Sequence, residues 1–170
     1  RMNDVSFQLS LLITMEQGYF DDTSVHEEFL ERYNDEYPHR DAYMKRAEKV
    51  FEFIEAMDLP PRSRWWKKAD VFTLIVELDR ALHERGMRLD PAIVKENLLI
   101  FETRLQQLAN HQGLEDVSTD YRSALSRYAH AAAQGSNHRK SRTTRGAIME
   151  SLLGSGDVEQ VVLFPLEDDT

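Results

Sequence analysis

Residues 66–85 read WKKADVFTLIVELDRALHER, and this stretch decides the fold. When it is wound as a helix, apolar residues cover much of its circumference: Val71, Phe72, Leu74, Ile75, Val76, Leu78, Ala81 and Leu82. A helix that is apolar over so much of its surface is normally buried at the centre of its bundle. Glycine commonly ends a helix, and Gly86 follows directly. The stretch therefore predicts a central helix from about Trp66 to Arg85.

On both sides of this helix, apolar residues recur every three or four positions, which is the spacing of amphipathic helices. Glycine and proline mark the expected helix ends, while Thr23 or Ser24, the Asp90-Pro91 pair and Ser118 mark helix starts. The expected helices cover about residues 2–17, 24–37, 43–57, 91–112, 118–133 and 141–153. The sequence thus predicts an all-α fold, a single bundle of about seven helices over residues 1–154. Residues 155–170 are expected to be an acidic C-terminal tail, with an extended segment at 161–164.

Composition limits the class of protein. With 41% hydrophobic and 30% charged residues, the 170-residue chain has the make-up of an ordinary soluble domain. No apolar run approaches the roughly 18 residues that span a bilayer, and no secretory signal is visible. The absence of cysteine excludes disulfides, thiol nucleophiles and cysteine-ligated metals. We expect a cytoplasmic protein without membrane contact. It either starts at Met2 or is a piece of a longer polypeptide.

Charge is unevenly distributed along the chain. The formal net charge is −9, which disfavours nucleic acid as a partner of the chain as a whole. Residues 121–150, however, hold six basic side chains and a single acidic one, a local charge of +5 that leaves −14 for the rest. The C-terminal part of the bundle therefore has its own electrostatic character.

The motifs of common catalytic sites are missing. There is no H-E-x-x-H metal motif, no G-x-S-x-G elbow, no phosphate-binding G-x-x-x-x-G-K-[ST] loop, and no lysine two residues after a carboxylate. Glu36 and His39 have the Glu-x-x-His spacing of di-iron bundles, but Pro38 interrupts the helix that such a site needs. We therefore expect no catalytic residue, no metal and no cofactor, and hence no enzymatic activity in this chain.

A first basic cluster, RSRWWKK, occupies residues 62–68. Cations beside indole rings are typical of proteins that stack nucleic-acid bases and contact phosphates, which makes Trp66, Lys67 and Lys68 candidate binding residues. In the alternative interpretation, one tryptophan anchors the start of the central helix in the core and the other covers it. We favour the anchoring interpretation for the tryptophan pair.

A second basic cluster, HRKSRTTR, occupies residues 138–145 and joins a loop to the start of the last helix. Helix N-termini favour anions, so Arg139, Lys140, Arg142 and Arg145 are candidate phosphate-binding residues. Cations at this end of a helix oppose its dipole and need an anionic partner. That partner is either an external phosphate or a carboxylate of the protein itself, and the sequence leaves both open.

Several residues around these clusters carry a family resemblance. The segment WKKADVFTL at 66–74 opens the central helix, Arg1 and Asp4 open the chain, and a set of residues follows in order near the end: Tyr128, Ala132, Gly135, Asn137, Arg142 and Arg145. Over residues 1–154 the chain resembles the C-terminal helical half of the bacterial D-G-Q-Q-R family. The N-terminal half of that family is a ParB/sulfiredoxin-like domain, and its members include GmrSD-type restriction and phage-defence proteins.

The resemblance implies a function without implying catalysis. The D-G-Q-Q-R motif, which is associated with nucleotide hydrolysis and DNA cleavage, belongs to the N-terminal half and is absent here. The chain is then a non-catalytic helical domain that supports a nuclease-like N-terminal domain, of the same or a companion chain, and contacts DNA phosphates. The alternative is a protein-interaction or dimerisation module, which forms homo-oligomers or binds other proteins without contacting nucleic acid.

Overall fold

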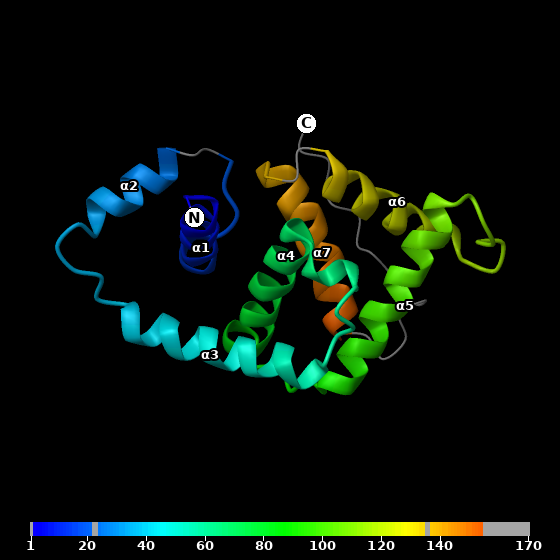
Figure 1. Ribbon diagram of the computed structural model, residues 1–170, viewed down its shortest axis with the longest axis horizontal. Helices are drawn as coiled ribbons and strands as arrows, with labels where there is room; N and C mark the ends of the chain where they lie inside the picture. The colour runs from blue at the N-terminus through cyan, green and yellow to red at the C-terminus, as the bar shows by residue number, and fades with distance from the viewer. Residues whose placement is uncertain (1, 22–23, 135–136, 155–170) are drawn as a thin grey trace.

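A computed structural model describes residues 2–21, 24–134 and 137–154. Its helices are α1 (Met2–Gln17), α2 (Ser24–Arg32), α3 (Arg40–Met57), α4 (Lys68–Asp79), α5 (Pro91–Ala109), α6 (Thr119–Ala133) and α7 (Arg139–Gly154) (Figure 1). These ranges contain no strand, which confirms the predicted all-α class and the number of helices. The C-terminal tail and its expected extended segment lie outside the described residues. None of the described helices is long and apolar enough to cross a membrane.

Helix α4 is the centre of the bundle and is crossed by α7 in Figure 1. It packs against α1, α3 and α7. Every residue from Phe72 to Asp79 is buried, and Leu74, Val76 and Leu78 have no exposed surface at all. This confirms the prediction of a central helix in this stretch, whose apolar residues cover much of its circumference.

The predicted helix is nevertheless divided at its start. A 3₁₀ turn, η1 (Arg64–Trp66), precedes α4, and the extended backbone of Lys67 (φ −69°, ψ 143°) separates the two. The indole of Trp65 is fully buried and donates from Nε1 to the carbonyl of Leu98 at 3.1 Å. The break lets the chain insert this ring into the core before α4 begins. A π-helical turn, η2 (Arg80–Glu84), replaces the last turn of the predicted helix.

Several predicted helix ends are confirmed. The side chain of Asp90 accepts a hydrogen bond from the backbone N–H of Ala92 at 2.8 Å, and that of Ser118 accepts one from Tyr121 at 3.2 Å. Gly18 follows the last residue of α1 with a φ of +89°, a conformation that side chains other than hydrogen disfavour.

Helix α2 ends earlier than the sequence predicts, at Arg32 instead of at Pro38. The hydroxyl groups of Tyr33 and Tyr37 both donate to the carboxylate of Glu16 on α1, at 2.9 and 2.7 Å. Leaving the helix allows both rings to reach this one carboxylate. A proline in the sequence could not reveal this, because the deciding acceptor lies in another helix.

Three carboxylates of α4 are buried, those of Asp70, Glu77 and Asp79. A buried carboxylate is costly unless it is paired and hydrogen-bonded. Each of the three lies against an arginine from a different part of the chain; the pairs are Arg64–Asp70 (3.1 Å), Arg80–Glu77 (2.8 Å) and Arg46–Asp79 (2.5 Å). The first and third pairs fix η1 and α3 against the central helix, while the second lies within the continuation of that helix into η2.

Close packing of α7 on α4 depends on Gly146. A Cβ atom at this position would lie 2.7 Å from Glu77 Oε1 and 2.7 Å from the hydroxyl oxygen of Tyr19. Those two atoms are themselves hydrogen-bonded at 2.8 Å, so neither moves freely. Only a residue without a side chain leaves room for this bond under the helix.

The central position of α4 predicts a large effect of cavity formation. Replacing Leu78 by alanine should lower the free energy of unfolding by about 2–5 kcal/mol, because the side chain is fully buried. Leu30→Ala is the matched control: Leu30 is exposed on α2, and its loss should change stability by less than about 0.5 kcal/mol. Chemical denaturation measures both. Similar effects of the two substitutions would contradict the central placement of α4.

The packing at Gly146 predicts a second effect on stability. Gly146→Ala should destabilise the fold by about 1–3 kcal/mol, because the new methyl group meets hydrogen-bonded atoms. The control is Gly154→Ala at the last residue of α7, where a Cβ would make an ordinary contact with Met87 at 3.7 Å. The melting temperatures of the two variants are measured by thermal unfolding. An unchanged melting temperature for Gly146→Ala would contradict the close packing described at this glycine.

Candidate anion-binding site

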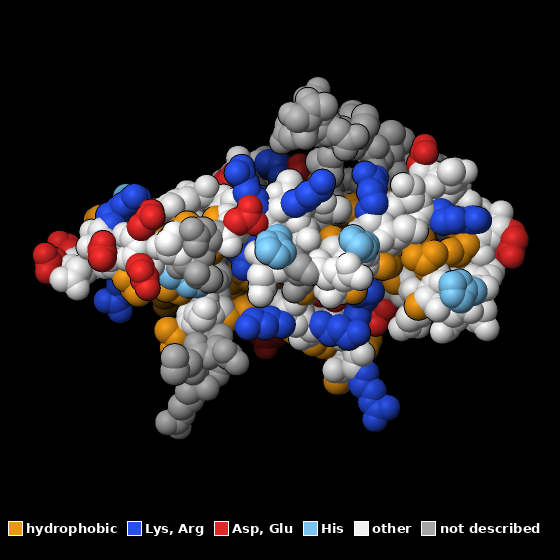
Figure 2. All heavy atoms as spheres, turned by 90° about the horizontal axis from the view of Figure 1, so that it is seen from above, with side chains coloured by type: hydrophobic (Ala, Val, Ile, Leu, Met, Phe, Trp, Pro, Cys, Tyr) orange, Lys and Arg blue, Asp and Glu red, His pale blue; other side chains and the backbone are white. Residues whose placement is uncertain are grey.

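Charged side chains are segregated on the surface. Figure 2 shows acidic side chains gathered at the α2 end of the molecule, while Lys and Arg side chains are spread over the middle of the same face. The exposed acids of α2 and the following loop are Glu27, Glu28, Glu31, Asp35 and Glu36. The first turn of α7, in contrast, has no acidic residue and carries Arg139 and Lys140 in exposed positions.

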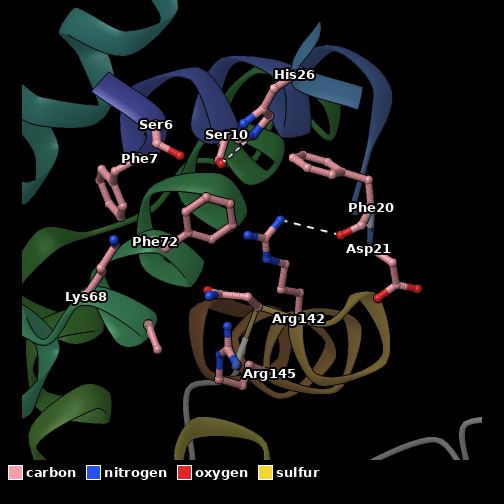
Figure 3. A pocket seen from close by; sticks show the side chains of 12 residues that line it. Ser6, Phe7, Ser10, Phe20, Asp21, His26, Lys68, Phe72, Arg142 and Arg145 are labelled. Carbon is pink, nitrogen blue, oxygen red and sulfur yellow. Dashed lines mark hydrogen bonds between the residues drawn. The ribbon is translucent and has the colours of Figure 1, made fainter. Parts of the chain in front are cut away.

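A pocket of about 230 Å³ lies between α1, the loop after α1, and the first turns of α2, α4 and α7 (Figure 3). Its polar lining includes Ser10, His26, Lys68, Asn137, Arg142 and Arg145, with Asp21 as the described carboxylate. Since α2, α4 and α7 all begin here, their positive dipole ends face the same space. Helix N-termini of this kind favour bound anions.

Arg142 is the central side chain of the pocket, and it is only 7% exposed. Its guanidinium carbon lies 5.0 Å from the ring centre of Phe20 and 4.7 Å from that of Phe72, between the two rings (Figure 3). Its Nη1 donates a long hydrogen bond of 3.5 Å to the carbonyl of Phe20. Among the residues that the structure describes, no carboxylate forms an ion pair with it. Burial, and then the neighbouring Arg145, lower the pKa of Arg142.

Arg145 lies deeper, at the floor of the pocket, and is 1% exposed. Its Nε donates to the hydroxyl of Thr73 at 3.1 Å and its Nη1 donates to the carbonyl of Ala131 at 2.7 Å. Burial lowers the pKa of Arg145, while the nearby Tyr128 and Asp70 act in the opposite direction. Arg145 therefore connects α7 to α4 and α6, and it contributes positive charge to the pocket from below.

His26 faces Arg142 from the first turn of α2. Its Nε2 lies 2.9 Å from the hydroxyl oxygen of Ser10 on α1, and its ring meets that of Phe20 edge-on. Burial, and then the positive charge of Arg142, lower the pKa of His26 below its usual value. At neutral pH the imidazole is therefore uncharged, and it becomes easier to protonate if an anion enters the pocket.

The cluster at 62–68 divides between core and surface. Trp65 is buried and Trp66 is 45% exposed, with its Nε1 donating to the carbonyl of Pro60 at 3.0 Å. This confirms the interpretation that one tryptophan anchors the start of the central helix. Lys67 and Lys68 are exposed, and Lys68 lies over the ring of Phe7 and lines the pocket.

The structure thus brings together candidates from both basic clusters. Lys68, Arg142 and Arg145 line the same pocket. Arg139 and Lys140 are exposed in the first turn of α7, and Trp66 and Lys67 are not part of the pocket lining. The four candidates outside the pocket remain predictions for the surrounding surface.

Sequence analysis did not identify Phe20, His26 and Phe72 as site residues. The two rings hold the guanidinium of Arg142, and nothing in the spacing of the sequence connects them with it. For His26 there was a signal, since it stands two residues after a helix-starting serine. Residues 2–21, 24–134 and 137–154 contain no group of three or more His, Asp or Glu side chains that could hold a metal ion.

In comparisons with known proteins, the chain matches no protein-family model, no curated protein and no solved structure. Function is therefore inferred from the chemistry of the pocket and of the surface around it.

The environment of His26 leads to a prediction about its titration. An NMR pH titration should place the midpoint of the His26 imidazole below about 6.5, the value of an unperturbed histidine. Arg142→Gln should raise this midpoint because it removes a positive neighbour. Because the unfolded chain binds the proton more readily, His26 should also reduce stability as the pH falls from about 6.5 towards the folded-state pKa.

A control separates this local effect from general charge effects. Lys95→Met removes a cation from α5, where Lys95 pairs with Asp58 and takes no part in the pocket. It should leave the midpoint of His26 unchanged. A midpoint at or above 6.5 in the wild type, or equal shifts in both variants, would contradict the described arrangement.

Proposed function

We propose that this chain is a non-catalytic helical domain of a DNA-targeting restriction or phage-defence protein, and that it contacts DNA phosphates where α4 and α7 begin. The observation that carries the proposal is the meeting of Lys68 with Arg142 in one pocket, from clusters far apart in the sequence. In this proposal a nuclease-like domain, of the same or a companion chain, packs on the bundle and supplies the catalysis. The protein then acts in the bacterial cytoplasm.

The charge around the pocket supports nucleic-acid phosphate as the ligand. Lys67, Lys68, Arg139 and Lys140 are exposed and stand at the N-termini of α4 and α7. Exposed lysine and arginine gain affinity for DNA by releasing counterions from the phosphate backbone. The acidic residues at the α2 end repel the same backbone, so the domain should bind weakly and only through this basic surface.

A second candidate function is favoured by a different surface. An apolar groove of about 340 Å³ lies between α1 and α3, with Leu12, Met15, Tyr43, Met44 and Phe51 in its lining. Met44 and Phe51 are 56% and 53% exposed. Exposed apolar patches often mark protein–protein contacts, so this groove supports an interaction or dimerisation module. If the domain does not bind DNA, protein interaction through this groove is the function that remains.

DNA binding is tested by its dependence on salt. The domain should bind duplex DNA with micromolar or weaker affinity at low salt, and affinity should fall as salt rises. The double substitution Arg139→Ala and Lys140→Ala should reduce the slope of log affinity against log salt by about two, since each phosphate contact contributes about 0.9. Both residues are exposed, so the melting temperature should stay unchanged.

The matched control removes two exposed cations from another helix. Lys45→Ala with Lys49→Ala, on α3, changes the net charge by the same amount and should leave the slope unchanged. Equal effects of the two double variants would show that net charge alone is responsible. No binding at low salt would overturn the DNA proposal in favour of the interaction module. DNA cleavage or nucleotide hydrolysis by the purified chain would overturn its non-catalytic part.

A further inference from the structure

The buried charge of Arg142 is not balanced by an ion pair within the described residues, in contrast to the buried carboxylates of α4. Asp70, Glu77 and Asp79 are each paired with an arginine. Arg142 is 7% exposed; within the described part of the chain its contacts are two aromatic rings and one distant carbonyl oxygen, and Asp21 acts on its charge without forming an ion pair. A buried cation is strongly destabilising unless an anion accompanies it. The guanidinium points into an accessible pocket, so a bound anion can provide that compensation.

Donors line this pocket from several elements. Arg142 comes from α7, Lys68 from α4, and the Ser10–His26 pair from α1 and α2, with the ring of Phe72 between Lys68 and Arg142 (Figure 3). A carboxylate has two oxygens in one plane, which suits a single guanidinium. Donors placed around one pocket on four helices suit a tetrahedral anion with three free oxygens better.

The volume and the net charge of the pocket indicate which kind of phosphate group it fits. The pocket volume of about 230 Å³ is below the roughly 300–1,000 Å³ of sites for drug-sized ligands, so it suits a small group. Lys68, Arg142 and Arg145 against Asp21 leave a net charge of +2 with His26 neutral. A phosphate monoester carries about −1.5 to −2 at pH 7, and each phosphate inside a DNA strand carries −1. The charge of the pocket therefore matches a monoester better.

The burial of Arg142 also favours a phosphate monoester. Arg142 is only 7% exposed, so a phosphate with a single ester bond can present more free oxygens to its guanidinium than one with two ester bonds. A phosphate inside a strand carries a sugar on each side, while a terminal phosphate carries a single ester bond. We propose that the pocket binds a phosphate monoester, which on a nucleic-acid strand is the phosphate at its end. That the monoester is the end of a nucleic-acid strand rests on the proposed function. The preference of the pocket for a phosphate monoester does not.

The test compares single-stranded oligonucleotides of one sequence with a 5′-phosphate, a 3′-phosphate or neither. The full chain should bind at least one phosphorylated strand about tenfold more tightly than the unphosphorylated one. Lys68→Met should abolish this difference, and it should fold normally because Lys68 is exposed. Lys67→Met, one residue earlier and outside the pocket lining, is the matched control and should preserve the difference. Arg142→Gln should also abolish it, if that variant keeps the melting temperature of the wild type.

A second measurement tests the pocket without DNA. Inorganic phosphate should shift the NMR signal of His26 and raise its titration midpoint, because an anion beside the imidazole favours its protonated form. Arg142→Gln or Lys68→Met should reduce the shift, and Lys67→Met should not. A signal of His26 that does not respond to phosphate would overturn the pocket as a phosphate site.

The outcomes separate this inference from the proposed function. Equal, salt-dependent binding of all three strands would overturn the terminal-phosphate inference and leave DNA binding through the exposed cations in place. Absence of binding to every strand would overturn the proposed function. The response of His26 to inorganic phosphate would then decide whether the pocket still takes a phosphate monoester.

Discussion

Burial of three carboxylates on one helix constrains most of this structure. Asp70, Glu77 and Asp79 lie along α4, and none of them is reached by water to a significant extent. Removing one partner of a buried ion pair leaves a charge that costs about 3–5 kcal/mol. Each carboxylate therefore requires its arginine, and the arginines come from η1, η2 and α3. The apolar residues of α4 drive it into the centre, but its carboxylates determine which segments pack there and in which orientation.

The need to balance a buried charge also distinguishes Arg142 from the charged residues around α4. Arg64 reaches Asp70 together with the hydroxyl of Tyr128, which donates to the same carboxylate at 2.8 Å. Burial of that phenol, and the charge of Asp70, raise the pKa of Tyr128 well above its usual value, so it remains a donor at all physiological pH values. Arg145, on α7, donates hydrogen bonds to the hydroxyl of Thr73 and the carbonyl of Ala131. Arg142, at the pocket, has two aromatic rings and a carbonyl at 3.5 Å but no ion pair among the described residues, so an external anion can balance its charge.

The sequence predicted the parts of the fold that depend on local signals. The apolar run around Leu74 and Leu78, the Asp90 cap and the Ser118 cap each act within a few residues, so their spacing is sufficient. The early end of α2 and the break at Lys67 depend instead on distant groups, Glu16 and the core around Trp65. No local pattern contains that information. The two candidate basic clusters were likewise visible, but their meeting in one pocket follows from the packing of α7 on α4.

The loop after α1 connects the core to the pocket. Tyr19 donates to the buried carboxylate of Glu77 at 2.8 Å, the carbonyl of Phe20 accepts from Arg142, and Asp21 accepts from the backbone N–H of Arg139. Three consecutive residues thus contact the central helix, the candidate ligand-binding arginine and the start of α7. Burial raises the pKa of Glu77, while Arg80 opposes this effect and the hydrogen bond from Tyr19 also favours the ionised form. The loop at Tyr19, Phe20 and Asp21 is therefore the direct connection between the candidate pocket and the buried carboxylate of the α4 core.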